Sequence, residues 1–160
     1  MTLIFWLPFC FAALHIFEEF VWPGGFSTWY ASYRPHVAES LTTRFLVIGN
    51  GILLLVACLL GWMGPLWSRG LSLWLILAAL LAANAIFHVR GVIVLGRYSP
   101  GVVTGVLLYL PLCIWGYWHF LATHEASWQF AAISCVVGAS YQFWTDFNHR
   151  RRSSDRVRET

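Results

Sequence analysis

The chain has 160 residues, of which 59% are hydrophobic and 11% charged, and its formal net charge is +3. Soluble domains typically have about 25% charged and about 45–50% apolar residues, so this composition excludes an ordinary soluble globule. The length excludes a second domain with its own core. Because so small a fold cannot bury this many apolar side chains, we predict a surface that faces lipid. Basic residues are not interleaved with aromatic ones outside the C-terminal tail, which argues against nucleic-acid binding.

Five apolar segments are long enough to cross the hydrocarbon core as helices, which takes about 17–25 residues. The first has neither the basic start nor the small-residue cleavage site of a signal peptide, so we expect it to be retained. Backbone groups in hydrocarbon must bond internally, so we predict an all-α transmembrane bundle over residues 1–149, with a basic cytoplasmic tail at 150–160. The predicted spans are Leu3–Val21, Leu41–Trp62, Leu71–Leu95, Val102–Leu121 and Trp128–Phe147.

The arginines predict the orientation of these spans. If the tail is cytoplasmic, five crossings place the N-terminus outside, and every arginine except Arg69 then lies on the cytoplasmic side. Such a positive-inside asymmetry is typical of integral membrane proteins. The segment Phe26–Ser40 is too polar to span but rich in aromatic residues, so we expect it to lie at headgroup depth.

Near the end of the first span, His15, Glu18 and Glu19 form the pattern His-x-x-Glu-Glu. Residues three and four apart share one face of a helix, so both carboxylates flank the imidazole. A charged side chain at the centre of a membrane helix costs roughly 2.5–3.5 kcal/mol, and ionisable residues there are functional candidates by default. An interfacial cluster neutralised by arginines such as Arg44 or Arg90 is the structural alternative.

Two further patterns follow along the chain. Asn84 and His88 lie four residues apart in the third span, and Tyr98-x-Pro-Gly-x-x-Thr104 leads into the fourth. In the predicted orientation, His88 and the first-helix trio approach the same cytoplasmic leaflet. Hydrogen bonding between helices for Asn84 and a simple turn for Tyr98 are the structural alternatives.

These three patterns, in this order, resemble the signature motifs of the HXXEE family, which are H-x-x-E-E, N-A-x-x-H and Y-x-P-G-x-x-T. The similarity runs from about residue 10 to 105 and shows no departure from the motifs. The resemblance implies a small bacterial membrane protein, hence one of the inner (plasma) membrane. The family has no established function, so the resemblance supplies candidate residues without a reaction.

The residue types favour a divalent metal. His15 and Glu19 on one helical face, with His88 as the third ligand, would give a His₂Glu set with an open position for water. We favour zinc, although iron and manganese also suit such ligands. Glu18 is then the candidate general base, Tyr98 an oxyanion donor, and Asn84 a group that orients His88 or the substrate.

The sequence-based hypothesis is a metal-dependent, hydrolase-like enzyme acting on a lipid or a small lipid-linked substrate near the cytoplasmic leaflet, and a homo-oligomer stays open. One alternative is a di-metal lipid oxidase or desaturase, which would need additional ligands from His36, Glu39 or Asp146. Another is a cation- or proton-binding transporter, against which the lack of an internal repeat argues. A structural subunit that contacts a partner protein is the third alternative.

Overall fold

The computed structural model describes residues 2–159, apart from the side chains of residues 142, 146, 149, 150 and 152–159. The described chain is helical without strands, which confirms the predicted all-α bundle. Short helical turns extend or connect the main helices: η1 (Thr2–Trp6), η2 (Pro35–Ser40), η3 (Gly64–Leu66) and η4 (Gly105–Tyr109). The α-helices are α1 (Leu7–Phe20), α2 (Phe26–Tyr33), α3 (Thr43–Met63), α4 (Gly70–Leu95), α5 (Val102–Thr104), α6 (Leu110–Ala122) and α7 (Trp128–Glu159).

Four helical stretches are long and apolar enough to cross a membrane, and they correspond to the first four predicted spans. The fifth, Trp128–Phe147, forms the first part of α7. Because some α7 side chains lie outside the described residues, the crossing of this fifth segment stays a prediction. The backbone of the tail continues α7 to Glu159, and its cytoplasmic location also stays a prediction. The four stretches are Thr2–Phe20, Thr43–Leu66, Gly70–Leu95 and Val102–Ala122.

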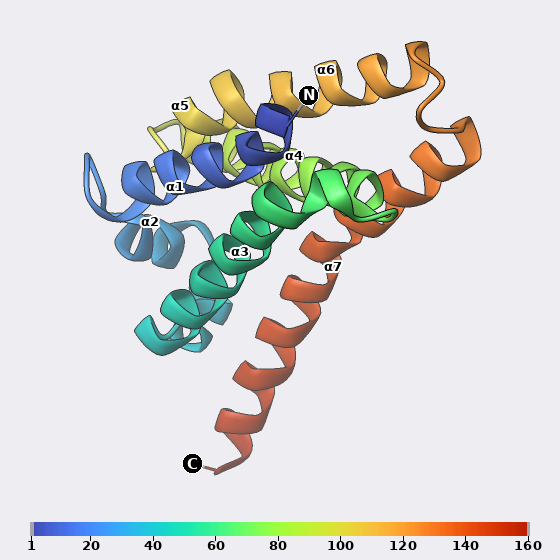
Figure 1. The fold of residues 1–160 in the computed structure, drawn as a ribbon. Coiled ribbons are helices and arrows are strands. Elements are labelled where there is room, and N and C mark those ends of the chain that lie inside the picture. Colours follow the sequence, from blue (N-terminus) through green and yellow to red (C-terminus); the bar gives the residue numbers. More distant parts are fainter. Residues whose placement is uncertain (1, 160) are drawn as a thin grey trace.

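The helix α4 forms the centre of the bundle, with α1, α3, α6 and α7 packed around it (Figure 1). A helix that is apolar on all sides is typically a buried one, and α4 has the most buried residues of the helices described in full. Its neighbours come close through glycine: a Cβ at Gly116 of α6 would lie 2.2 Å from the Trp74 ring. The Trp74 indole also donates a 2.9 Å hydrogen bond to the carbonyl of Ile4 and thereby anchors the N-terminal turn.

A tight loop after α4 reverses the chain and brings three helix ends together. Gly96 ends α4 in the left-handed conformation (φ 64°), and Gly101, at φ 97°, precedes α5. Both backbone positions favour glycine. The loop sets the start of α5 against the ends of α1 and α4. The candidate residues gather at this junction.

The span that begins with α5 contains a widened turn. Residues Gly105–Tyr109 form a π-helical stretch (η4) just before Pro111, whose nitrogen cannot donate to the preceding turn. Tyr109 is buried there, and its ring lies 4.5 Å from that of His15.

Candidate metal centre

The three predicted metal ligands lie together between α1 and α4. His15 and Glu19 occupy one face of α1, four residues apart, and His88 faces them from α4. Glu19 Oε1 lies 3.4 Å from His15 Nε2 and 3.1 Å from His88 Nε2. All three side chains are buried, and one ligand atom of each falls within 4.8 Å of the others. Among the described residues they form a group that could hold a metal ion.

The spacing of these atoms suits a shared ion. Zinc binds imidazole nitrogen and carboxylate oxygen at about 2.0–2.2 Å, so two ligands at a tetrahedral angle lie about 3.3–3.6 Å apart. The Glu19–His15 distance falls within that range, and the Glu19–His88 distance is slightly shorter. A cation between these atoms would need only small side-chain adjustments.

Hydrogen bonds on the outer nitrogens turn both imidazoles toward this point. His15 Nδ1 lies 2.8 Å from Thr104 Oγ1, and His88 Nδ1 lies 2.9 Å from Ser99 Oγ. Thr104 donates its single hydroxyl proton to Glu18, so it must accept the Nδ1 proton of His15. In the neutral ring, the lone pair of His15 is then on Nε2, the nitrogen that lies near Asn84 and Glu19. Such outer bonds are typical of metal-binding histidines.

Glu18 faces away from this group and binds the loop before α5. Its two carboxylate oxygens accept five hydrogen bonds. A carboxylate offers about four lone-pair directions, so few remain for a substrate proton. The first amides of a helix have no partner within it and favour a nearby anion, which explains the buried charge. The general-base role stays a prediction, and this geometry does not favour it. The donors are the Tyr98 and Thr104 hydroxyls and the amides of Gly101, Val103 and Thr104.

The other two predicted site residues have different surroundings from each other. Asn84 Nδ2 donates to His15 Nε2 at 2.9 Å and lies 3.5 Å from His88 Nε2, so its amide touches both imidazoles. Tyr98 is partly exposed and donates its hydroxyl proton to Glu18. Partial burial and this hydrogen bond raise the pKa of the Tyr98 phenol, so it keeps its proton at neutral pH. An oxyanion-stabilising role for Tyr98 stays a prediction.

Aromatic residues of α2 cover the centre. The Trp29 ring stacks on the His88 ring with 5.7 Å between centroids, and Phe26 lies 5.9 Å from the same imidazole. Phe26, Trp29 and Tyr30 are buried within the protein, and the headgroup depth of this segment stays a prediction. The signal that the sequence did offer was the unusual aromatic content of the segment. Its buried side chains keep water from one side of His88.

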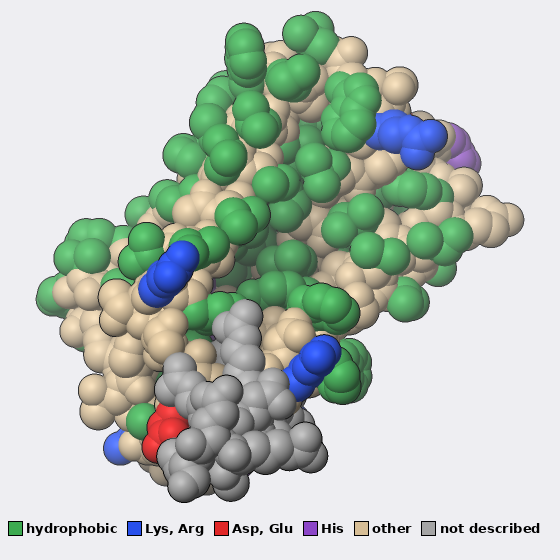
Figure 2. Space-filling model, turned by 90° about the horizontal axis from the view of Figure 1, so that it is seen from below, with side chains coloured by type: hydrophobic (Ala, Val, Ile, Leu, Met, Phe, Trp, Pro, Cys, Tyr) green, Lys and Arg blue, Asp and Glu red, His purple; other side chains and the backbone are tan. Residues whose placement is uncertain are grey.

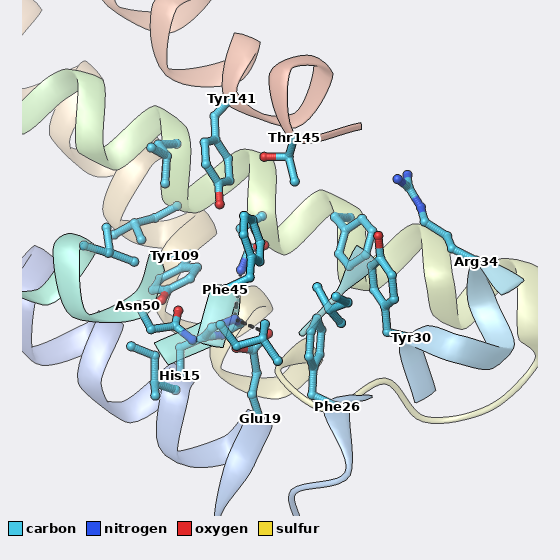
Figure 3. A pocket seen from close by; sticks show the side chains of 18 residues that line it. His15, Glu19, Phe26, Tyr30, Arg34, Phe45, Asn50, Tyr109, Tyr141 and Thr145 are labelled. Carbon is cyan, nitrogen blue, oxygen red and sulfur yellow. Dashed lines mark hydrogen bonds and ion pairs between the residues drawn. The ribbon is translucent and has the colours of Figure 1, made fainter. Parts of the chain in front are cut away.

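A cavity of about 110 Å³ opens onto His15, Glu19 and Asn84 (Figure 3). This volume has room for several water molecules. Asn50 of α3 and Tyr141 of α7 also line it. Sequence reasoning overlooked Asn50, yet an amide in the middle of an apolar span is itself unusual in a membrane helix.

Of the additional ligands that a di-metal centre needs, the two whose side chains the structure describes do not reach this group. His36 and Glu39 are exposed in η2, and the side chain of Asp146 lies outside the described residues. Within the described side chains, the geometry supports one metal position rather than two.

The comparison with protein families agrees with the motifs. The model of a family described as "Protein of unknown function with HXXEE motif" matches residues 6–116, which is more than two-thirds of the chain. The chain belongs to the HXXEE family. All six predicted site residues of this HXXEE protein lie within the matched region. No curated protein and no solved structure matches the chain. Its function must therefore be argued from the site.

Proposed function

We propose that this HXXEE protein is a membrane-embedded metal hydrolase that acts on a lipid or lipid-linked substrate. The observation that carries the proposal is the buried His15–Glu19–His88 group. Three ligand atoms converge in it, and the Thr104 hydroxyl fixes the proton of His15 on the outer nitrogen. Electron-rich atoms buried this closely need a cation or shared protons between them. A His₂Glu set is a ligand set of catalytic zinc sites, with one position left for water.

Zinc in this position would lower the pKa of a bound water towards about 7 and polarise a carbonyl or phosphoryl oxygen. A metal held there would supply the activation that the sequence pattern suggested for Glu18. Glu18 then has a positioning role, because it holds Thr104 against His15. Asn84 lies beside the Nε2 atoms, where its amide can orient a bound water or substrate oxygen.

The position of the centre in the bundle favours a lipid substrate. The ligands lie in the last turns of α1 and α4, which are long and apolar enough to cross a membrane. The linkage between a lipid headgroup and its chains lies at this depth, near the end of a span rather than at its middle. With the arginine-rich loops and tail on the cytoplasmic side, the centre lies near the inner leaflet of the membrane.

Metal removal tests the proposal. Protein purified without added metal should contain about one zinc ion per chain by elemental analysis. In vesicles of phosphatidylethanolamine and phosphatidylglycerol it should release fatty acids or headgroups detectable by mass spectrometry. A chelator should abolish this release, and added zinc should restore it. Protein that holds no metal and takes none up, or lipids that stay unchanged, would refute the metal or the hydrolase part respectively.

The hydroxyl of Thr104 gives a finer test of the centre. Thr104→Val keeps the shape but removes the bond to His15 Nδ1, so zinc affinity should fall by about 10–100-fold. Competition with a fluorescent chelator measures this affinity. The control is Thr123→Val, because the Thr123 hydroxyl is exposed and bonds only at the far end of α6. Equal affinities of the two variants would contradict the assigned role of Thr104.

A further inference from the structure

A second cavity of about 740 Å³ lies between α3, α4 and α7. Much of its lining is apolar, including Ile52 and Val56 of α3 and Ile76 and Leu77 of α4. Seen from below, this face of the molecule has a recess walled by hydrophobic side chains (Figure 2). The volume is in the usual range for small-molecule sites, about 300–1,000 Å³.

This groove and the cavity beside the metal centre have walls in common. Asn50 and Leu53 of α3, Leu80 of α4, and Tyr141 and Thr145 of α7 line both. The lining differs between the parts: Val56 and Leu73, which line the groove but not the cavity, are apolar, the shared residues include polar side chains, and His15 and Glu19 line the cavity but not the groove. The Asn50 side chain has no hydrogen-bond partner among the described residues, so its amide is available to a polar group at this point.

We propose that the groove binds one acyl chain of a membrane amphiphile and that the polar linkage of this molecule reaches the cavity beside His15 and Glu19. The groove lies against α3 and α4, both apolar enough to span a membrane, and in hydrocarbon the molecules available to fill it are lipid chains. The change from apolar to polar lining matches the order of parts in such a molecule. This inference rests on the proposed function, because the groove specifies the substrate of that centre as a lipid that enters sideways from the bilayer.

Two glycines of α3 provide a matched test. Gly49 lines the groove, Gly51 does not, and a Cβ at either position would meet no atom within 4 Å. Leucine at either position improves helix propensity by a similar amount, roughly 1 kcal/mol, so both variants should fold. Only the leucine of Gly49→Leu projects into the groove. It should displace at least about two methylene groups of a bound chain.

The experiment uses a single-chain phospholipid with a diazirine in its acyl chain, in vesicles of phosphatidylethanolamine and phosphatidylglycerol. After illumination, peptide mass spectrometry locates the labelled residues. In the wild type we expect labels at groove residues such as Ile76 and Trp144. These labels should fall roughly tenfold in Gly49→Leu, as expected from displacing about two methylene groups, and stay unchanged in Gly51→Leu. Zinc content should be the same in all three proteins.

Several outcomes would overturn the inference. Groove labels no stronger than those at other lipid-facing residues, or equal in the two variants, would mean that no chain binds specifically. A change in oligomeric state in Gly49→Leu alone would mean that a second copy of the chain fills the groove. The proposed function can fail separately. If the protein holds no metal but its groove labels still fall in Gly49→Leu, the acyl site is supported and the metal centre is not. Protein that holds zinc but gives equal labels loses the acyl site alone.

Discussion

Glu19→Gln should remove the bound metal almost completely, with a zinc affinity more than about 100-fold below that of the wild type. Glu19 supplies the only carboxylate of the described three-residue group, and its Oε1 lies near both imidazoles. An amide is a weaker ligand and carries no charge to offset that of the ion. The loss should therefore exceed the 10–100-fold typical of outer hydrogen-bond partners such as Thr104. Elemental analysis and chelator competition measure it.

Glu39→Gln is the matched control, because it makes the same chemical change at an exposed residue of η2. This variant should keep the zinc content and affinity of the wild type. If Glu19→Gln also retained about one zinc ion per chain, the metal would lie elsewhere and the proposed centre would be wrong. Loss of metal from both variants would point to a general effect on the fold and would also count against the assigned ligand role.

Gly101→Ala should damage the same centre from the side of the loop. Gly101 has φ 97°, and a Cβ there would lie 2.8 Å from His15 Cε1, 2.9 Å from His88 Cε1 and 3.1 Å from Glu19 Cγ. The left-handed backbone costs a residue with a Cβ about 1–2 kcal/mol, and overpacking typically costs another 1–3 kcal/mol. Since the contacts are with all three ligands, we expect both lower thermal stability and loss of most bound zinc.

Gly96→Ala separates these two effects. Gly96 also has a positive φ, 64°, but a Cβ there would meet nothing within 4 Å. This control should lose about 1–2 kcal/mol of stability through the backbone alone and keep its zinc. Thermal unfolding in detergent and elemental analysis of both variants provide the comparison. If Gly101→Ala bound zinc as well as Gly96→Ala does, the close packing of Gly101 on the ligands would have no bearing on metal binding.

The sequence was most informative where the physics is local. Lipid-facing composition and span length depend on the chain alone, so four predicted helices appear within a few residues of their expected ends. The spacing of His15 and Glu19 also follows from helical periodicity, which places residues four apart on one face whatever surrounds them. The three motifs were enough to identify the family, since each is read directly from neighbouring residues.

The role of Glu18 illustrates what the sequence leaves open. Two adjacent glutamates of one helix look equivalent in the pattern, but they point in directions about 100° apart. Glu19 faces His88, and Glu18 faces the loop at Gly101–Thr104. Which carboxylate meets the ligands depends on how α1 is rotated against α4 and α5, and no local rule sets that rotation.

The sequence by itself determined the helical, apolar character of this protein, its family, and the residue types available for chemistry. Only the tertiary structure decided that His15 and His88, 73 positions apart, meet at one carboxylate, that α2 packs on His88, and that the cavity beside them shares lining residues with a largely apolar groove. The physical reason is that helix formation depends on neighbours within a few residues, whereas these contacts arise from side-chain packing between distant segments, which local pattern does not encode.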